Sequence, residues 1–322
     1  AGTVVRQPRT YYVNDASVEG DLFCAGPGND GNTGQSTNSP LPSLQKLLAQ
    51  YTLQPGDTVY ADTGLYNLDS NVVIDAQHSG SAELPVTLIG ARGGTRLIRS
   101  ANGSDRCCLD VKADHLRIGG FACESAEIGI RIQADAARHV RLTANRCRSN
   151  SVCGIQITPM AGGYGEMFQL LQNVVTDNGA GLYLQGDADV WGGRAQFLIE
   201  NNTIRNTGHA VYLLNGNRVA RRINVLKNNI LVATGGESAC IAALIKSVHY
   251  SDYNVLRAPN GSVGHLFYDP ADPDPTPLTD LSLWRTATGG QDSHSLSADP
   301  LFVSPAQDDF RLRSDSPCAD AG

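Results

Sequence analysis

Residues 195–206 read Ala-Gln-Phe-Leu-Ile-Glu-Asn-Asn-Thr-Ile-Arg-Asn, and related segments recur along the chain. Aligned on one asparagine, these segments share Asn145, Asn173, Asn202, Asn228 and Asn254, at intervals of 28, 29, 26 and 26 residues. Three positions before the asparagine lie Leu142, Leu170, Ile199, Val225 and Ser251, and two positions after it lie Cys147, Val175, Ile204, Ile230 and Leu256. Apolar residues at alternating positions predict a short strand with one buried face in each repeat.

A second strand is predicted in each repeat. It begins at a glycine or another small residue: Cys108, Gly129, Gly154, Gly181 and Ala210. Repeats of about 27 residues with short strands and no helical periodicity are typical of a coil in which each turn, or rung, packs on the next. The sequence therefore predicts an all-β, single-stranded parallel β-helix, with the asparagines stacked about 4.8 Å apart at one corner. The alternatives are a β-propeller, whose blades are longer, and a β-sandwich.

The segments on either side are expected to close the ends of one continuous domain. Residues 1–105 are assigned to an N-terminal cap and the first rungs, with a short amphipathic helix near residues 42–50. Residues 106–259 are assigned to regular rungs, and residues 260–322 to a C-terminal loop and an irregular cap. Four prolines within residues 269–277 predict that this stretch has no regular structure.

Composition narrows the function. The chain has 322 residues, a net charge of −7 and no block of basic residues, so we expect no nucleic-acid partner. No apolar run approaches the ~18 residues that cross a bilayer, so we expect no membrane insertion. Residues 1–6 lack both an initiator methionine and a signal-peptide core, which favours a mature or excised portion of a protein. Eight cysteines favour a secreted or cell-surface location, extracellular or periplasmic.

One disulfide between rungs is expected. Cys123 and Cys147 each stand eight residues after a histidine, His115 and His139, which places them at equivalent inward positions of adjacent rungs. Neighbouring strands bring Cα atoms to about 4.8 Å, within the range that a disulfide accepts. The alternatives are a bridge from Cys147 to Cys153 and a pair of buried thiols. The histidines form no sequence cluster, and we expect no zinc site.

Three stretches carry a family resemblance. They are Tyr11-Tyr-Val-Asn with Cys24-Ala-Gly-Pro-Gly-Asn-Asp-Gly-Asn-Thr-Gly, Pro55-Gly-Asp-Thr-Val-Tyr-Ala-Asp-Thr-Gly-Leu-Tyr, and the ending from Asp299-Pro-Leu-Phe-Val onward. Together they resemble the secreted bacterial right-handed parallel β-helix proteins of the pectin-lyase-like superfamily. The resemblance implies a right-handed coil. The superfamily includes polysaccharide lyases, glycoside hydrolases, uronate epimerases and repeat domains without catalysis, and the fold does not choose among them.

Enzymes of this architecture hold their substrate along one sheet, which directs attention to the outward side chains of the second strands. One predicted stripe is Asp110, Arg131, Gln156, Tyr183, Tyr212 and Ala242. The stripe beside it is Lys112, Gln133, Thr158, Gln185, Leu214 and Leu244. Tyrosine and amide side chains suit the rings and hydroxyls of sugars. The alternative is an ordinary solvated face.

Roles are assigned on this face and in the loops that follow it. A lyase must neutralise a carboxylate, remove the proton α to it and protonate the leaving oxygen. The predicted catalytic residues are Arg131, Tyr183, Tyr212 and Lys112. The predicted substrate-binding residues are Gln156, Gln185, Trp191 and Arg218. The predicted ligands of a Ca²⁺ ion, which the reaction does not require, are Glu166, Asp187 and Asp189.

Two functions remain open. The first is a secreted protein that cleaves or modifies an acidic polysaccharide by β-elimination, favoured over epimerisation and over hydrolysis by paired carboxylates. The second is a non-catalytic glycan-binding or structural module of a larger cell-surface protein. The expected partner is a polysaccharide in either case.

Overall fold

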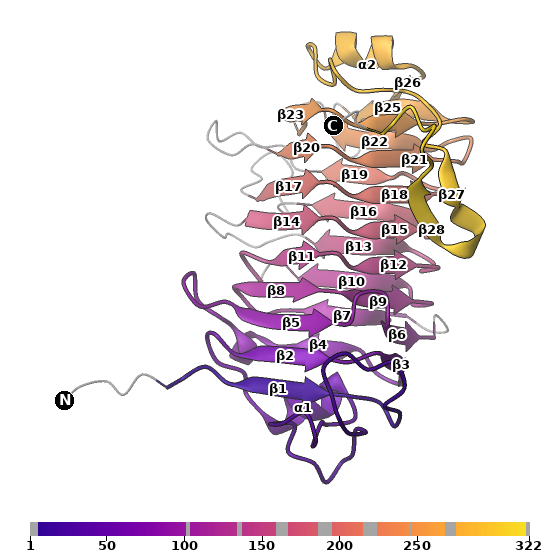
Figure 1. The fold of residues 1–322 in the computed structure, drawn as a ribbon. Coiled ribbons are helices and arrows are strands. Elements are labelled where there is room, and N and C mark those ends of the chain that lie inside the picture. Colours follow the sequence, from indigo (N-terminus) through magenta and orange to yellow (C-terminus); the bar gives the residue numbers. More distant parts are fainter. Residues whose placement is uncertain are drawn as a thin grey trace, which may run out of the picture.

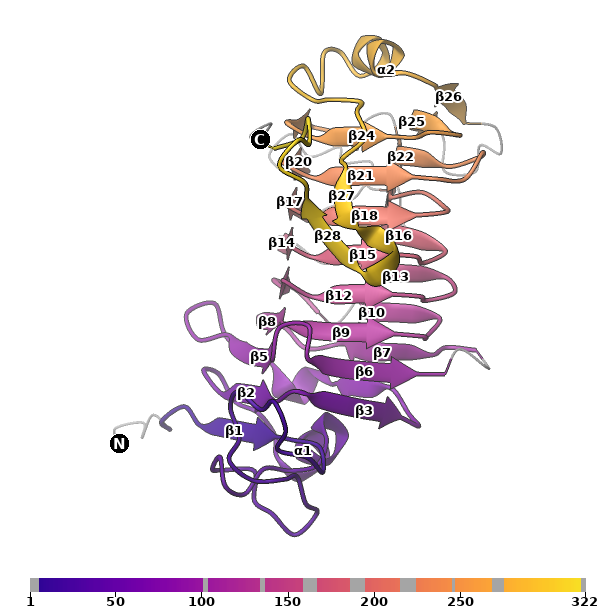
Figure 2. The same cartoon turned by 45° about the vertical axis from the view of Figure 1, so that its right-hand side comes forward.

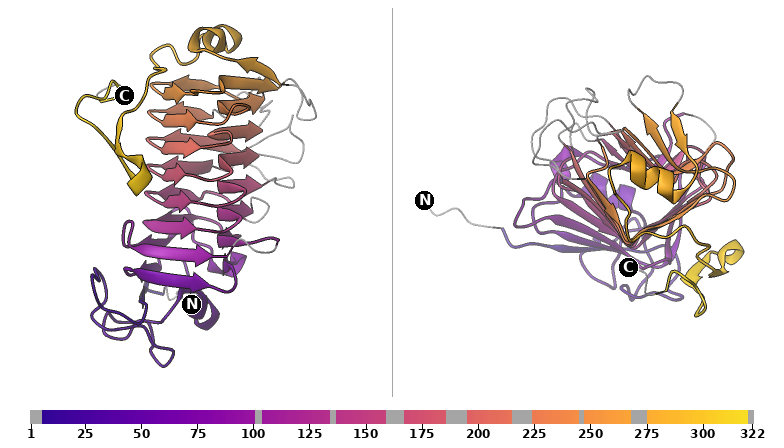
Figure 3. Two further views of the ribbon diagram at one scale, coloured as in Figure 1. Left: turned by 90° about the vertical axis from the view of Figure 1, so that its right-hand side faces the viewer. Right: turned by 90° about the horizontal axis from the view of Figure 1, so that it is seen from above.

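The computed structural model describes residues 6–100, 104–133, 137–158, 167–185, 195–214, 224–244, 247–267 and 275–319. Over these residues the chain winds as a right-handed parallel β-helix whose strands stack into three sheets (Figure 1). Seen along the coil axis, the sheets enclose one apolar core (Figure 3). The predicted fold class is confirmed.

The three sheets are named A, B and C, and their strands follow chain order, as a coil requires. Sheet A contains β1 (Thr10–Val13), β2 (Thr58–Ala61), β5 (Val86–Gly90), β8 (Leu116–Gly119), β11 (Arg141–Thr143), β14 (Met167–Leu171), β17 (Gln196–Glu200), β20 (Val225–Lys227) and β23 (Tyr250–Asp252). Sheet B contains β3 (Gly64–Leu68), β6 (Thr95–Arg99), β9 (Phe121–Glu124), β12 (Arg146–Arg148), β15 (Val174–Thr176), β18 (Thr203–Asn206), β21 (Ile230–Ala233) and β24 (Val255–Arg257). Sheet C contains β4 (Val72–Ile74), β7 (Cys107–Val111), β10 (Ile128–Gln133), β13 (Cys153–Thr158), β16 (Ala180–Gln185), β19 (Val211–Leu214), β22 (Ala239–Leu244), β25 (Ser262–Phe267) and β26 (Thr276–Leu278).

Inward positions stack similar side chains on successive rungs. Phe168 of β14 and Phe197 of β17 lie in register, with ring centroids 5.7 Å apart. Leu142 and Leu170 form the same kind of pair between β11 and β14, and all four side chains are buried. Because side chains of the same type stack on successive rungs, the core has a nearly constant cross-section and each rung packs closely on the next.

An asparagine ladder runs along the corner between sheets A and B. Its members are Asn145, Asn173, Asn202, Asn229 and Asn254. Each side-chain amide donates to the carboxamide oxygen of the next member at 3.0 to 3.2 Å. The backbone N–H of each member donates to the same oxygen, so polar groups buried at the turn are paired.

The expectation that Asn228 belongs to this ladder is wrong. Asn228 has a left-handed backbone with φ of 56°, and Asn229 faces inward in its place. Leu226 and Leu231 accordingly supply the inward residues of this rung. The residue before each other ladder member is also left-handed: Ala144, Gln172, Asn201 and Tyr253. Asparagine is tolerated both at the left-handed position and at the ladder position of this turn. Sequence spacing alone therefore does not show which of two adjacent asparagines belongs to the ladder.

A second ladder, which the sequence analysis missed, follows the corner between sheets B and C. Asn150 donates to Asn178 at 2.8 Å, and Asn178 donates to Asn206 at 3.2 Å. These asparagines lie five or four residues after members of the first ladder, so the same repeat carries both. Two of the three corners of the coil are therefore fixed by stacked amides.

A helix packs at each end of the coil. Helix α1 (Leu44–Gln50) buries Leu44 and Leu47 in the core, and the hydroxyl of Ser43 caps its first turn. Helix α2 (Leu281–Ala287) lies over the last rungs (Figure 3). Its Trp284 is fully buried against Gly264. A Cβ atom on Gly264 would lie 2.1 Å from the Trp284 ring, so this contact requires glycine. Among the described residues, no helix is long and apolar enough to cross a membrane.

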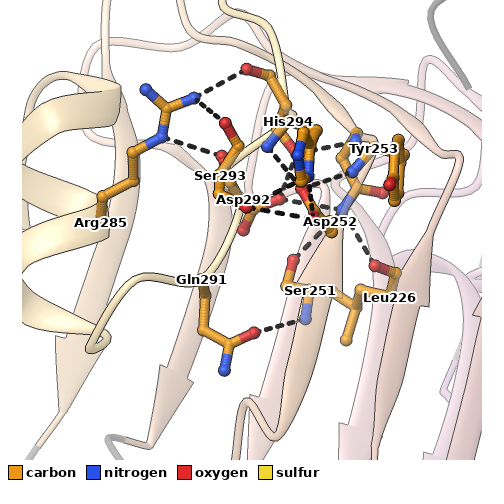
Figure 4. Close-up of polar contacts among 11 residues, drawn as sticks. Leu226, Ser251, Asp252, Tyr253, Arg285, Gln291, Asp292, Ser293 and His294 are labelled. Atoms are coloured by element: carbon orange, nitrogen blue, oxygen red, sulfur yellow. Dashed lines mark hydrogen bonds and ion pairs between the residues drawn. The ribbon is translucent and has the colours of Figure 1, made fainter.

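The first ladder ends on the segment after α2. The side-chain amide of Asn254 donates to the carboxylate of Asp292 at 3.0 Å, and the Trp284 indole donates to the same carboxylate at 2.8 Å. Beside it, Asp252 of β23 and His294 are 2.7 Å apart (Figure 4). Hydrogen bonds from His294 and Tyr253 hold the pKa of Asp252 below its usual value, despite its burial.

The C-terminal segment differs from the predicted irregular cap. Strand β26 lies within the proline-rich stretch and pairs antiparallel with β25, an edge position that tolerates proline. The hairpin of β27 (Phe302–Ser304) and β28 (Asp309–Leu312) lies along the outside of sheet B (Figure 2). An ion pair of 3.0 Å between Arg146 and Asp308 holds it there. Only the part around α2 covers the end of the coil.

The predicted rung alignment of two cysteines is present without the disulfide. Cys123 and Cys147 are register partners in β9 and β12, but all eight cysteines are free thiols. Parallel register keeps the two Cβ atoms about 4.8 Å apart, beyond the 3.5–4.5 Å that a disulfide prefers. The alternative partner Cys153 lies on the outer side of sheet C, against Cys107 and Ile128.

Candidate functional site

The outer face of sheet C carries the predicted stripe in continuous register. Successive strands align Asp110, Arg131, Gln156, Tyr183, Tyr212, Ala242 and His265. The stripe beside it aligns Gln133 with Thr158, Gln185 with Leu214, and Leu244 with Phe267. The strands of β7 to β19 span four rung spacings of about 4.8 Å. The four residues predicted to be catalytic therefore fall into two groups, with Lys112 and Arg131 at one end of the face and Tyr183 and Tyr212 at the other.

The first group is an ion-paired cluster at the lower end of the face. Arg131 donates two hydrogen bonds to Asp110, at 2.8 and 3.1 Å, and also pairs with Asp105. The amide of Gln133 donates to the Asp110 carboxylate at 2.8 Å, and the ammonium of Lys112 lies 3.8 Å from it. The Asp110 side chain is only 4% exposed.

This pairing neutralises the cations that the sequence analysis assigned to catalysis. The hydrogen bonds that Arg131 donates to Asp110 raise the pKa of its guanidinium above the usual value; burial opposes this shift and the bond to Asp105 reinforces it. Two carboxylates and two cations balance, so the cluster presents little net charge to a ligand. Asp105 and Asp110 both bond to Arg131, so they do not form an open oxygen site for Ca²⁺.

The second group is an aromatic stack at the upper end. The rings of Tyr183 and Tyr212 lie 5.2 Å apart and nearly parallel, and His209 stacks on Tyr212 at 5.5 Å. His265 meets His209 edge-on at 5.3 Å, and Phe267 meets Tyr212 edge-on at 5.6 Å. Because the tyrosine faces are turned toward one another, a sugar meets ring edges and hydroxyls rather than an open stacking face.

The titratable groups of the stack are kept uncharged at neutral pH. Burial raises the pKa of Tyr183, and burial with the neighbouring Tyr183 raises that of Tyr212. Burial and the neighbouring His265 lower the pKa of His209 to about 4, and burial lowers that of His265. The Nδ1 atom of His209 accepts the backbone N–H of Ala239 at 3.0 Å, which places the ring proton on Nε2.

Between the two groups lies Gln156, half-buried and in register with both Arg131 and Tyr183. Gln185 borders the stack on the neighbouring stripe. The other predicted site residues lie outside the described ranges: Glu166, Asp187, Asp189, Trp191 and Arg218. The same holds for most of the proline-rich loop.

The sequence analysis missed the clustering of histidines. His209 and His265 meet on sheet C, and His115 and His139 stack beside sheet A with ring centroids 4.5 Å apart. The signal was present, because His115 and His139 precede equivalent strands. Spacing rules for metal ligands do not detect neighbours brought together by a coil.

Comparison with known proteins supports the fold. The chain is similar in structure to the pectate lyase Pel9A, with a TM-score of 0.53 and 12% identity over 96% of this chain and 91% of that one. An alginate lyase from Paenibacillus sp. str. FPU-7 gives a TM-score of 0.38 and 14% identity over 70% of this chain and 90% of that one. No protein-family profile and no curated protein matches the chain. The likeness to Pel9A thus supports the parallel β-helix fold.

Proposed function

We propose that the chain is a secreted, polysaccharide-active β-helix protein that binds a sugar chain along the outer face of sheet C. The observation that carries this proposal is the unbroken register from the Asp110–Arg131 cluster through Gln156 to the tyrosine stack. A polymer lying along the coil axis would meet a new side chain about every 4.8 Å. Amide, guanidinium and phenol groups supply donors and acceptors for sugar hydroxyls and carboxylates.

We further propose cleavage of an acidic polysaccharide by β-elimination at Tyr183 and Tyr212. One tyrosine, as phenolate, takes the proton α to the carboxyl group, and the electrons form a carbon–carbon double bond as the bond to the glycosidic oxygen breaks. The other, as phenol, protonates the leaving oxygen. Their rings lie 5.2 Å apart, so both can reach one linkage. Gln156, on the next rung, is the candidate for binding the carboxylate. Arg131, one rung further, contributes at most hydrogen bonds, because Asp110 and Asp105 already neutralise its charge.

The raised pKa values of both tyrosines give this reaction a characteristic pH dependence. A base with a raised pKa is deprotonated only at alkaline pH, so the rate is expected to increase with pH above neutrality. A screen of polyuronates, followed by the ultraviolet absorbance of the unsaturated product, tests the reaction. Tyr183→Phe and Tyr212→Phe should each abolish turnover, whereas Tyr250→Phe on sheet A should not. Normal turnover in either stack variant would contradict the assignment.

The second candidate is a glycan-binding module without catalysis. It is favoured by the pairing of Arg131 and Lys112 with Asp110, because no free cation remains there to neutralise a uronate. Binding of oligosaccharides without product formation at any pH would select it. In that case Tyr183→Phe and Tyr212→Phe should each weaken binding, because each removes a hydroxyl that contacts the ligand. A bound Ca²⁺ ion, which the reaction does not require, is compatible with either candidate, and membership of a larger cell-surface protein belongs to the second.

A further inference from the structure

The outer face of sheet A carries arginines that have no carboxylate partner among the described residues. Arg117 of β8 and Arg141 of β11 are register partners, so their backbones lie about 4.8 Å apart. Both side chains are exposed, as is Arg92 in the turn after β5. Within the described part of the chain, none of the three forms an ion pair; Arg141 donates only to the hydroxyl of Thr143, at 3.2 Å.

Two adjoining cavities open over this row. One, of about 320 Å³, is lined by Arg117 and Arg141 together with His115, His139, Met167 and Gln169. The other, of about 390 Å³, shares the same two arginines and adds Arg92 and Thr143. Arg117 and Arg141 thus line both cavities, one toward the starts and the other toward the ends of β8 and β11, and the two cavities together form a shallow groove over the arginine pair.

The histidines at one end of this groove add nitrogen donors. The rings of His115 and His139 are stacked within 1° of parallel. Asp114 lies 3.7 Å from the Nδ1 atom of His139, but its carboxylate already accepts backbone N–H groups of His115 and Arg138. The ligand atoms of Asp114, His115 and His139 lie within 4.8 Å of one another, a grouping that could hold a metal ion. In this arrangement, however, the parallel rings direct their in-plane lone pairs side by side rather than toward one point. The buried Nδ1 atom of His139 has no hydrogen-bond partner within the described residues.

Unpaired arginines in direct cross-strand register are unfavourable for the folded protein alone, because like charges repel at this distance. A bound anion removes that repulsion. The planar guanidinium group matches a carboxylate with two parallel hydrogen bonds. The feature that costs stability in the free protein therefore favours an anionic ligand.

We propose that this arginine groove (Arg92, Arg117, Arg141, His115 and His139) binds the carboxylates of an acidic polysaccharide. This inference takes the class of ligand from the proposed function, but it does not depend on catalysis at sheet C. Arginines on successive rungs meet successive charges of an extended chain, while Met167 and the imidazole rings contact sugar carbons. A nucleic acid fits less well, because three guanidiniums on a protein of net charge −7 release few counterions.

The test is a titration of the whole chain with oligogalacturonate and with its methyl ester, which keeps the sugar and removes the charge. The double variant Arg117→Ala/Arg141→Ala should bind oligogalacturonate at least ~10-fold more weakly, since it loses charge-assisted hydrogen bonds. The matched control is Arg311→Ala, an exposed arginine of the hairpin already paired with Asp309. Binding should also weaken with added salt, and the ester should bind equally weakly to all three proteins.

The outcomes separate this proposal from the proposed function. Weakened binding in the double arginine variant, with turnover of short substrates retained or absent, supports the groove whatever happens at sheet C. Unchanged binding in that variant overturns the groove, even if the tyrosine variants lose binding and turnover. Equal binding of the ester, or tighter binding of a single-stranded oligonucleotide than of oligogalacturonate, also overturns it.

Discussion

Sheets A and C are built from the same rungs, yet they differ in whether the arginines on their outer faces are paired with carboxylates. On sheet C, Arg131 is paired with Asp110 and Asp105, and the pKa of the half-buried His209 is lowered to about 4. On sheet A, Arg117 and Arg141 stand side by side with no carboxylate partner in the described residues. The backbone therefore fixes which residues align, whereas the partner on the neighbouring rung decides whether a charge is available to a ligand.

The largest expected effect concerns the paired charge on sheet C. Asp110→Ala removes the main partner of Arg131 and leaves a mostly buried cation, with only 13% of its side chain exposed. The free energy of unfolding should fall by about 3 kcal/mol, as for other broken buried pairs. Urea denaturation measures this value.

The matched control is Asp177→Ala, which breaks the exposed cross-rung pair with Arg205, whose atoms are 2.9 Å apart. Exposed pairs contribute little, so this loss should stay below about 1 kcal/mol. Equal losses of unfolding free energy in the two variants would show that burial does not increase the contribution of the Asp110–Arg131 pair.

The second prediction concerns pH. The pKa of His209 is lowered from 6.5 to about 4, so between these values the unfolded chain binds a proton that the folded chain does not. Stability should therefore decrease as the pH falls from about 6.5 to about 4, by on the order of 2 kcal/mol from this residue.

Denaturation of wild type and His209→Asn at several pH values measures that contribution. The asparagine oxygen can still accept the Ala239 N–H, and the variant should lose the extra slope. Tyr183→Phe serves as control, because its phenol does not titrate in this range. An unchanged slope in His209→Asn would contradict the assignment.

The third prediction contrasts ligand contacts. The double variant Tyr183→Phe/Tyr212→Phe keeps the ring stack and removes both hydroxyls. Binding of a neutral oligosaccharide that uses sheet C should weaken by about 1–2 kcal/mol for the lost hydrogen bonds, with the unfolding free energy nearly unchanged. Calorimetric titration measures it. Identical affinities of wild type and the double variant would show that the sugar does not contact the tyrosine hydroxyls.

The smallest expected effect is on sheet A. Arg117→Gln removes one member of an unpaired like-charge pair, so stability should increase by roughly 0.3 kcal/mol at low salt and by less at high salt. Thermal unfolding at two ionic strengths detects the difference. A loss of stability similar to that expected for Asp110→Ala would show that Arg117 has an essential partner, and the contrast between the faces would disappear.

The alignment of both faces was predictable, but the state of their side chains was not. The repeat placed Arg131, Gln156, Tyr183 and Tyr212 on one stripe, because register follows from periodicity. The bidentate pairing of Arg131 with Asp110 depends on rotamers and burial, which a period does not encode. Likewise, the turn at Asn228 and Asn229 needed the backbone conformation, since each asparagine satisfies one of its two positions.

The ladder along the first corner has a direction, and that direction has a consequence for assembly. Each side-chain amide donates a hydrogen bond to the next member toward the C-terminal end. The last one, Asn254, donates to the carboxylate of Asp292, which acts only as an acceptor in this series. Trp284 covers the rung beside it. At this corner, a second copy approaching end-on would find no side-chain donor among the described residues that continues the series. The ladder therefore ends within the chain, which opposes end-on growth of the coil at this corner.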